Sequence, residues 1–385
     1  GVALAAADFG PSHQLTELTL TDAGLKSIDL SWNRSLHRLE LTGNHFGTLN
    51  IRGANDAFQK TVLTDINLSR NELTEVTLND NYTIHHLDLS HNKLTELSFK
   101  DGDMLETVNL QDNLLTTLNF SYSTLMTSLN VADNLLTSLY IPEDNALTTL
   151  RVENNHLHFG TLPQIPGLTT FSYAPQKPVL IAQKGPGADL SAYNFNGLTT
   201  YTWRKDTGEA LNLGTDYTCE GGKTHFLEPI HGTKVYGEMR HVAFPALTLT
   251  TTEIEAAGMP THQLASFTTT ADAQGTLILV ASEPNSTVCI DWGGEGLELE
   301  QYVVGTSVTS FNVTARKGAT ARVYSYADAD NLTVFSMRGV KVGTMDASQM
   351  KNLTALTVKD AGMTAITLPD NDKLVELTLE GNQLT

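Results

Sequence analysis

Cysteine is almost absent from this sequence, which contains only Cys219 and Cys289 among 385 residues. Two cysteines cannot build the disulfide framework of a small secreted domain, and no C-x-x-C pair or His–Cys group indicates a metal site. The two residues fall in segments of different composition, so we expect no bridge between them. Free cysteines often pack as small apolar residues, and we predict that both are buried thiols.

Basic residues are also scarce, because 24 Lys and Arg stand against 43 Asp and Glu, which gives a net charge of −19. Binding to phosphate backbones requires a basic surface, so this balance argues against a nucleic-acid partner and disfavours docking on an anionic membrane. No segment approaches the ~18 consecutive apolar residues that predict a transmembrane helix. The sequence also lacks a nucleophile elbow, a phosphate-binding loop and a dinucleotide-binding fingerprint, so we expect no enzymatic activity and no cofactor.

The sequence does contain a repeat of 21 residues. Its reference unit runs from Ile84 to Leu94 and follows the frame L-x-x-L-x-L-x-x-N-x-L. A degenerate copy starts at Leu15, and each unit repeats within itself at steps of 10 and then 11 residues. One step is longer, because it contains an insertion at about 52–62. Such self-similarity predicts a solenoid. Further copies of the frame start at Leu36, Leu63, Leu105, Met126 and Leu147.

The spacing of the leucines predicts which side chains point inward. In an extended L-x-L segment both leucines lie on one side of the strand and the middle residue lies on the other. One coil cannot bury its leucines alone, whereas stacked coils can, at roughly 25 cal/mol per Å² of apolar surface removed from water. We therefore expect parallel strands with leucine inside and polar residues outside.

The Asn that recurs at the same position of the repeat predicts a column of buried polar side chains in the core. The bend after each strand leaves backbone N–H and C=O groups without partners, and a buried Asn has both the acceptor and the donor to satisfy them. Replacing a middle member of this column, such as Asn113, by Ala should cost on the order of 1–3 kcal/mol. The predicted structural ladder consists of Asn44, Asn71, Asn92, Asn113, Asn134 and Asn155.

These leucine and asparagine columns, over residues 15–175, resemble those of bacterial (Bacteroidetes-type) extracellular leucine-rich repeat proteins. The similar class has a 21-residue repeat with two near-identical halves and is called IRREKO-like. The resemblance implies parallel strands along both sides of a flattened coil, with little or no helix. It also implies a location outside the cell or on the bacterial cell surface, and a role in binding.

The composition changes after a last strand signal at 168–173, where Pro175 begins a linker. Residues 176–253 contain short alternating runs separated by Gly, Asp and Asn, and the run 200–205 leads into a hairpin turn at 206–208. This texture predicts a small β-sandwich with Trp203 as its central aromatic residue. The segment is similar to the immunoglobulin-like modules without disulfides that accompany leucine-rich repeats in such proteins.

Two further segments complete the predicted organisation. Residues 254–331 are again β-patterned, and Ile290-Asp291-Trp292-Gly293 resembles a signature of small sandwiches that cap such repeats. The 21-residue frame then returns over 332–385, with starts at Leu332, Leu353 and Leu374. The predicted fold is thus mainly β: a leucine-rich repeat solenoid (1–175), an Ig-like β-sandwich (176–253), a β-sandwich cap domain (254–331) and the start of a second array (332–385). The sequence ends midway through a unit, so we expect more repeats to follow.

Outward strand positions and exposed aromatic residues are the candidates for binding. The outward column of the first half-repeat runs from Glu17 to Glu153, and the column of the second half-repeat is equally polar. Extended solenoid faces suit large partners, and aromatic side chains are frequent anchors, although a solvated sheet surface explains the same pattern. The candidate binding residues are Trp32, Arg38, Glu40, Phe58, Asp65, His86, Asp88, Tyr140 and Arg151.

Two groups of residues, one of histidines and one of aspartates, are candidates for metal binding. His85 and His86 are adjacent on an expected strand and should diverge, whereas zinc needs converging ligands. Calcium at a turn edge is the second alternative, but the acidic residues there lack calcium-loop spacing. We therefore predict no metal site. The acidic residues in question are Asp101, Asp103, Asp112 and Asp133.

The sequence supports a secreted or cell-surface protein that recognises a protein partner on its solenoid faces, as in cell adhesion. One alternative is a carbohydrate-binding surface protein that stacks sugars on Trp203 or Trp292. A second alternative is a structural spacer for another domain. The identity of the ligand, the binding face, the anchor and the oligomeric state all remain open at this point.

Overall fold

The computed structural model describes residues 6–10, 12–30, 32–51, 62–78, 83–98, 104–293, 299–326 and 330–385. The chain divides into two compact units. The first comprises residues 1–179 with 193–200 and 239–250, and the second comprises 180–192, 201–238 and 251–385. Phe58, a candidate binding residue, lies outside the described residues, as do Asp101 and Asp103.

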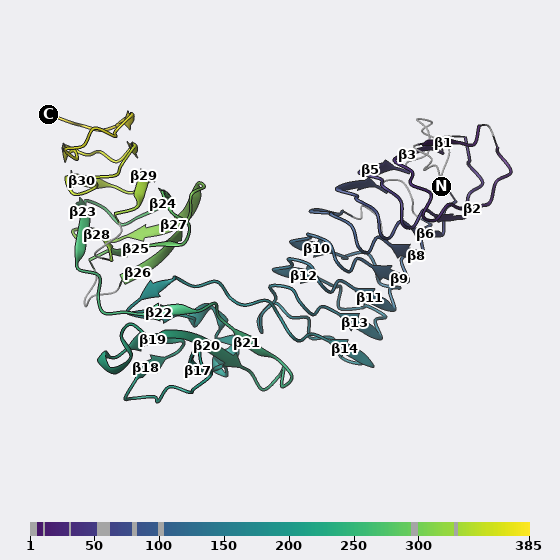
Figure 1. The fold of residues 1–385 in the computed structure, drawn as a ribbon, viewed down its shortest axis with the longest axis horizontal. Coiled ribbons are helices and arrows are strands. Elements are labelled where there is room, and N and C mark those ends of the chain that lie inside the picture. Colours follow the sequence, from purple (N-terminus) through teal and green to yellow (C-terminus); the bar gives the residue numbers. More distant parts are fainter. Residues whose placement is uncertain are drawn as a thin grey trace. The chain divides into compact units, whose positions relative to one another are not determined.

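The first unit is a β-solenoid whose described residues form one parallel sheet of eight strands (Figure 1). Neighbouring strands are one repeat apart, so that Asp65 pairs with Arg38 on one side and with His86 on the other. The predicted solenoid of parallel strands is therefore confirmed. In spatial order the strands are β14 (Thr170–Ser172), β13 (Thr149–Arg151), β11 (Ser128–Asn130), β9 (Thr107–Asn109), β8 (His86–Asp88), β6 (Asp65–Asn67), β4 (Arg38–Glu40) and β2 (Glu17–Thr19).

The opposite side of the coil is less continuous. There the described residues form pairs of parallel strands rather than one sheet: β1 (Ala6–Asp8) with β3 (Ser27–Asp29), β5 (Thr48–Asn50) with β7 (Glu75–Thr77), and β10 (Thr117–Asn119) with β12 (Ser138–Tyr140). The half-repeats on this side carry no regular asparagine column, so fewer side-chain hydrogen bonds connect coil to coil.

The interior of the solenoid is the stack of inward leucines that the frame predicts. Leu39, Leu68 and Leu89 are fully buried, whereas Ile28, Val76 and Leu139, the middle residues of β3, β7 and β12, are half-buried. Burying one such side chain stabilises the fold by about 1.5–3 kcal/mol, so the stack supplies most of the attraction between coils.

The residue before each ladder asparagine adopts a left-handed backbone conformation. This conformation disfavours most side chains but is tolerated by Gly and, among the others, best by Asn and Asp. The requirement suits the Gly, Asp and Asn members of this column, whereas Arg70 and His91 adopt the conformation without that preference. The six members are Gly43, Arg70, His91, Asp112, Asp133 and Asn154, with φ between 54° and 71°, and Asp22 adopts the same conformation before Ala23, at the degenerate first copy of the frame.

Two loops close the end of the solenoid beyond β14. Phe244, in the segment 239–250, is buried and packs on Phe159 and Tyr173, with ring centroids 6.3 and 5.6 Å apart. His241 is also buried, and its Nε2 lies 3.1 Å from the carbonyl of Phe195, in the segment 193–200. These loops cover the last leucine layer, which water would otherwise reach.

Residues 180–256 form two sheets and short 3-10 helices. Trp203 is fully buried between the sheets, where its ring contacts Phe226 edge-on and its Nε1 donates to Thr224 Oγ1 at 3.0 Å. The predicted core aromatic and the predicted turn at 206–208 are both confirmed. One sheet has the order β15 (Lys184–Gly185), β22 (Ile254–Ala256), β20 (Lys234–Arg240), β17 (Thr200–Lys205), with β21 (Thr248–Thr250) on β20; the other has β16 (Gly187–Asp189), β19 (Lys223–Phe226), β18 (Tyr217–Glu220); the helices are η1 (Ser191–Tyr193), η2 (Phe195–Gly197) and η3 (Glu228–Ile230).

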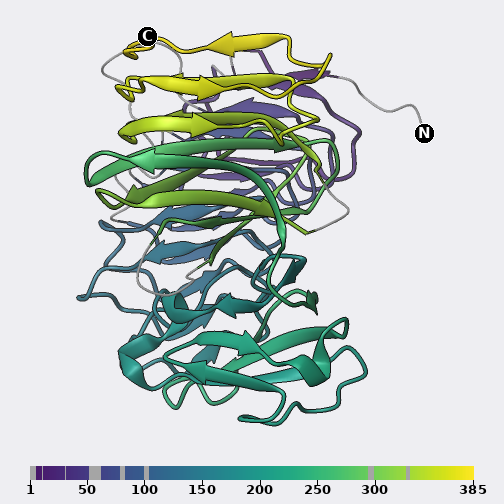
Figure 2. The ribbon, with the colours of Figure 1, turned by 90° about the vertical axis from the view of Figure 1, so that its left-hand side faces the viewer.

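Residues 262–378 form two larger sheets in which antiparallel and parallel strands meet. Figure 2 shows the yellow C-terminal coils stacked directly on the green strands that precede them. One sheet has the order β26 (Leu299–Val304), β25 (Ser286–Asp291), β28 (Thr320–Ser325), β23 (His262–Thr269), β30 (Val342–Asp346), β32 (Ala365–Thr367). The other has β27 (Thr309–Ala315), β24 (Ala273–Ala281), β29 (Leu332–Arg338), β31 (Ala355–Lys359), β33 (Glu376–Thr378).

The second repeat array is built as the sequence predicts. Val334 of β29 pairs with Ala355 of β31, which pairs with Glu376 of β33, so the register again advances by 21 residues. A single hydrophobic core runs from Leu264 to Met363 through both segments. The antiparallel strands thus continue into the coils without a break in either sheet.

The two cysteines occupy different environments. Cys289 is fully buried, as predicted, and burial raises the pKa of its thiol to about 12. Cys219 is only half-buried, so the prediction of a buried thiol is wrong there. It lies on β18, the edge strand of a three-stranded sheet, where β19 pairs with it on one side.

Candidate functional site

A shallow concavity of about 440 Å³ lies on the outer face of the eight-stranded sheet. It extends over the strands from β4 to β13. Each three-residue strand points its middle residue into the core and its first and third residues outward, because side chains alternate along a strand. The face therefore consists of two side-by-side columns of outward residues.

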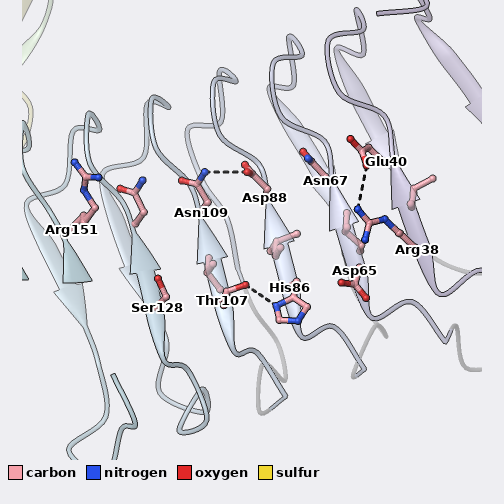
Figure 3. A pocket seen from close by; sticks show the side chains of 15 residues that line it. Arg38, Glu40, Asp65, Asn67, His86, Asp88, Thr107, Asn109, Ser128 and Arg151 are labelled. Carbon is pink, nitrogen blue, oxygen red and sulfur yellow. Dashed lines mark hydrogen bonds and ion pairs between the residues drawn. The ribbon is translucent and has the colours of Figure 1, made fainter. Parts of the chain in front are cut away.

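The two columns differ in chemistry (Figure 3). The first-position column begins with Arg38 and Asp65, and the third-position column begins with Glu40 and Asn67. Most members are small or polar, so the floor is a hydrogen-bonding surface rather than an apolar pocket. In register order, the first column is Arg38, Asp65, His86, Thr107 and Ser128, and the third is Glu40, Asn67, Asp88, Asn109, Asn130 and Arg151.

Hydrogen bonds between neighbouring coils hold several of these side chains in place. Asn109 Nδ2 donates to Asp88 Oδ2 at 3.1 Å, and His86 Nδ1 lies 2.8 Å from Thr107 Oγ1 (Figure 3). Arg38 and Glu40 are 3.5 Å apart at the other end of the face. A side chain that is already oriented loses less conformational entropy when it binds a ligand.

The third-position column also shapes the backbone. The Oδ1 atom of Asp88 accepts the N–H of Ser90 at 2.9 Å, and Asn130 Oδ1 accepts the N–H of Ala132 at 3.2 Å. Asn and Asp are suited to such bonds with the backbone two residues ahead. The column is thus rich in these residues for a structural reason, and their second polar atom bonds to a neighbouring coil: Asp88 Oδ2 accepts from Asn109, and Asn130 Nδ2 donates to Gln111 Oε1 at 3.0 Å.

Arg151 closes one end of the face and contacts Glu153 through Nε at 3.1 Å and an Nη atom at 2.8 Å. Glu153 was expected on the exposed face, which is wrong, because only 9% of its surface is accessible. It lies two residues beyond the end of β13, where the chain has already turned. Its carboxylate therefore positions the guanidinium of Arg151 rather than forming part of the face.

The structure brings together Arg38, Glu40, Asp65, His86, Asp88 and Arg151 among the candidate binding residues. Trp32 and Tyr140 are exposed, at 51% and 56%, but they do not line this concavity. Tyr140 lies on β12, which belongs to the opposite side of the coil. Asn67, Asn109 and Asn130 were expected in the outward column but were not among the candidate binding residues, and the structure shows that they line the concavity.

The asparagine column lies beneath this face and forms bonds from coil to coil. Asn113 accepts the N–H of Leu94 through Oδ1 at 3.0 Å and donates through Nδ2 to the carbonyls of Leu89 and Leu110 at 3.0 and 3.1 Å. All members are buried, and each repeats this pattern. The residues that accept such a backbone N–H through Oδ1 are Asn44, Asn71, Asn92, Asn113, Asn134 and Asn155.

A further ladder member was not recognised from the sequence. Gln176 Oε1 accepts the N–H of Leu157 at 3.2 Å, and Nε2 donates to Val152 and Tyr173. It stands eight residues after Leu168, which is the asparagine position of the frame. Its longer side chain has the same amide, so the position in the frame was more informative than the residue type.

His85, His86 and His91 contact carboxylates or hydroxyls of the next coil rather than one another. His85 lies 2.9 Å from Glu106, and His91 lies 2.8 Å from Asp112. The rings of His85 and His86 are 6.4 Å apart and tilted by 50°. No group of three or more His, Cys, Asp or Glu side chains able to hold a metal ion occurs in the described parts of the chain.

The acidic residues considered for calcium have other partners. Asp133 accepts from Gln111 at 3.0 Å and from Asn154 at 2.7 Å, whereas Asp112 contacts His91. Asp133 and Asp112 also adopt the left-handed conformation that each coil requires before its ladder residue. Their presence is explained by the fold and not by a cation.

Neither tryptophan of the carbohydrate alternative can stack on a sugar. Trp203 is fully buried, and Trp292 is 7% exposed. Trp292 packs edge-on against Phe267 at 5.8 Å, and its Nε1 donates to Glu300 at 2.9 Å. Both rings are buried in cores, so the predicted stacking of sugars on Trp203 or Trp292 is wrong.

Comparisons with known proteins show a distant structural similarity. No protein-family model and no curated protein sequence matches the chain. Among solved structures, the chain is similar to the functional domain of InlJ from Listeria monocytogenes, which is described as including a cysteine ladder. The identity is 17% and the TM-score is 0.31, over 65% of this chain and 69% of that chain.

Proposed function

We propose that this chain is a non-enzymatic binding protein that recognises a protein partner on the outer face of the eight-stranded sheet. One observation carries the proposal: a shallow concavity of about 440 Å³ extends over the strands from β4 to β13 and is lined by outward polar side chains. Extended solenoid faces bind large partners because a rigid backbone presents many side chains without reorganisation.

The context of this function is part of the same proposal. The chain is an extracellular or bacterial cell-surface protein of the leucine-rich repeat type, with a role in adhesion. It is divided into the solenoid (1–175), an Ig-like module (176–253), a cap module (254–331) and a second array (332–385). In the described residues, no helix is long and apolar enough to cross a membrane.

Within the proposed site, Arg38, Glu40, Asp65, His86 and Asp88 contact the partner. Arg151 forms the far rim. Trp32 and Tyr140 remain separate predictions, since they belong to other parts of the coil and line no recess together with these residues.

Binding of arrayed extracellular proteins by the full chain tests the proposal. Proteins that bind are measured again with Thr107→Trp/Ser128→Trp, which fills the middle of the concavity. The control variant is Thr117→Trp/Ser138→Trp, which places the same bulk on exposed positions of β10 and β12. Loss of binding in the first variant alone supports the proposal. Binding that survives in both variants, or no binding partner at all, rejects it in favour of another surface or a spacer.

A further inference from the structure

Charge is distributed unevenly along the concavity. The part formed by β4, β6 and β8 carries three carboxylates, on Glu40, Asp65 and Asp88. The part formed by β9 and β11 carries only hydroxyl and amide groups, from Thr107, Asn109, Ser128 and Asn130. One half of the face is therefore acidic, and the other half is neutral and hydrogen-bonding.

The strand register explains how three carboxylates can share this half. Like charges directly opposite each other on paired strands are destabilising. Here Glu40 stands opposite Asn67, which in turn stands opposite Asp88. Asp65 lies in the other column, between Arg38 and His86. Each carboxylate thus has a neutral or basic neighbour, and none faces another acid.

Glu40 and Asp65 keep most of their acceptor capacity for a ligand, whereas Asp88 already accepts from Ser90 N, Ser90 Oγ and Asn109 Nδ2 and contributes mainly its charge. Arg38 and Glu40 form an exposed pair at 3.5 Å, and such pairs contribute little to stability, so Glu40 can exchange this partner. Asp65 accepts a hydrogen bond through Oδ2 from Thr64 Oγ1 at 2.7 Å. Each carboxylate oxygen has two lone pairs, so both residues can accept further donors.

We infer that the acidic half of this face binds a basic, extended polypeptide segment of the partner protein. This inference rests on the proposed function and names the partner's chemistry. Neighbouring strands are about 4.8 Å apart and alternate side chains of an extended peptide about 6.6 Å apart, so long Lys or Arg side chains reach carboxylates on successive coils. The neutral half hydrogen-bonds the peptide backbone that continues across β9 and β11.

The charge of the whole chain favours the same partner. A net charge of −19 attracts basic segments over distance and raises their association rate, while the local carboxylates decide where they dock. A metal ion would require three or more converging ligands, which the described residues do not provide. The acidic half instead spreads its charges over three strands, as a peptide requires.

The test uses the full chain and three probes: octalysine, octaglutamate and a neutral Gly-Ser octamer. The acid-swap variant is Glu40→Asn/Asp65→Thr/Asp88→Asn. Each replacement already occurs at the same column position in neighbouring coils, as at Asn109 and Thr107, so folding should be preserved. The matched control, Glu75→Gln/Glu96→Gln/Glu143→Gln, removes the same charge from exposed positions outside the concavity.

We expect octalysine to bind the native chain and the control variant with similar affinity. Binding to the acid-swap variant should be weaker by about threefold for each lost ion pair, or about 30-fold in all. The other two probes should not bind. Equal binding by all three proteins, or an equal loss in both variants, overturns the inference, because the attraction would then reflect total charge.

The two proposals fail separately. A protein partner can lose binding to Thr107→Trp/Ser128→Trp and still bind the acid-swap variant as tightly as the native chain. This result leaves the proposed function intact and overturns the basic-segment inference. Neutral glycans that bind this face independently of the acid swap overturn it as well. Partners unaffected by the tryptophan variant reject the proposed function itself, whatever octalysine does.

Discussion

Removing one member of the asparagine ladder tests whether polar bonds between coils stabilise the solenoid as much as the leucine stack does. Asn113→Ala deletes an amide that accepts from Leu94 and donates to Leu89 and Leu110. Leu94, Leu89 and Leu110 are fully buried, so water cannot replace the lost partner without opening the coil. The methyl group of Ala has neither a hydrogen-bond donor nor an acceptor, so it cannot replace the amide.

The magnitude follows from the groups left without partners. The N–H of Leu94 and at least one carbonyl lose their hydrogen bond, and each buried orphan costs about 1–3 kcal/mol, so we expect a loss of about 2–6 kcal/mol. Asn119→Ala is the matched control. Asn119 is exposed, and its Oδ1 accepts only from Ser121 nearby, so this change should cost less than about 1 kcal/mol.

Urea unfolding followed by circular dichroism measures both variants. Repeat arrays can open in parts rather than in one step, so hydrogen exchange at the amide of Leu94 supplies a local measurement. A free energy of unfolding for Asn113→Ala within about 0.5 kcal/mol of the Asn119→Ala value, with unchanged protection at Leu94, would refute the reasoning.

Three further predictions concern other parts of the chain. Burial lowers the pKa of His158 from 6.5, so the folded chain binds fewer protons there than the unfolded chain. The free energy of unfolding is therefore intact above about pH 6.5 and falls as the pH drops through that value towards the lowered pKa. Thermal melts of His158→Asn should show a shallower loss of stability at acid pH than those of the native chain. Because burial raises the pKa of Cys289 to about 12, we expect Cys219 alone to react with a thiol reagent at pH 8 in the native protein, and equal rates for both thiols would contradict the fold. Gly187→Ala should destabilise the second unit by about 1–3 kcal/mol, because the added Cβ would lie 1.9 Å from a backbone oxygen of β19. The control is Gly305→Ala, whose Cβ would meet no atom within 4 Å. Similar melting temperatures for the two variants would count against the close approach of β16 and β19.

The repeat could be predicted from the sequence because it depends on local spacing. Two leucines around one residue decide which way a strand faces, and a fixed period decides its pairing partner, as for Asp65 between Arg38 and His86. The outward positions of the face follow from the same rule, since Asp88 alternates with Leu87 and Leu89. The residue at a ladder position follows less strictly, as Gln176 shows.

Other features depended on contacts between distant segments. The burial of Trp292 and Trp203, which removes them as sugar platforms, depends on packing against Phe267 and Phe226. The cover of the last coil by Phe244 joins segments more than 70 residues apart. No local pattern specifies which loop reaches which surface.

The sequence by itself determined the solenoid, its register and the alternation of buried leucine with outward polar residues, because these are consequences of a strand period of two within a repeat of 21. Only the tertiary structure decided which outward residues share a recess. Proximity across strands requires that coils stack in one register, and the insertion at about 52–62 means that no constant sequence spacing links Arg38 and Glu40 to Asp65 and Asp88. Stacking places these charges on one face and leaves Trp32 and Tyr140 elsewhere on the coil.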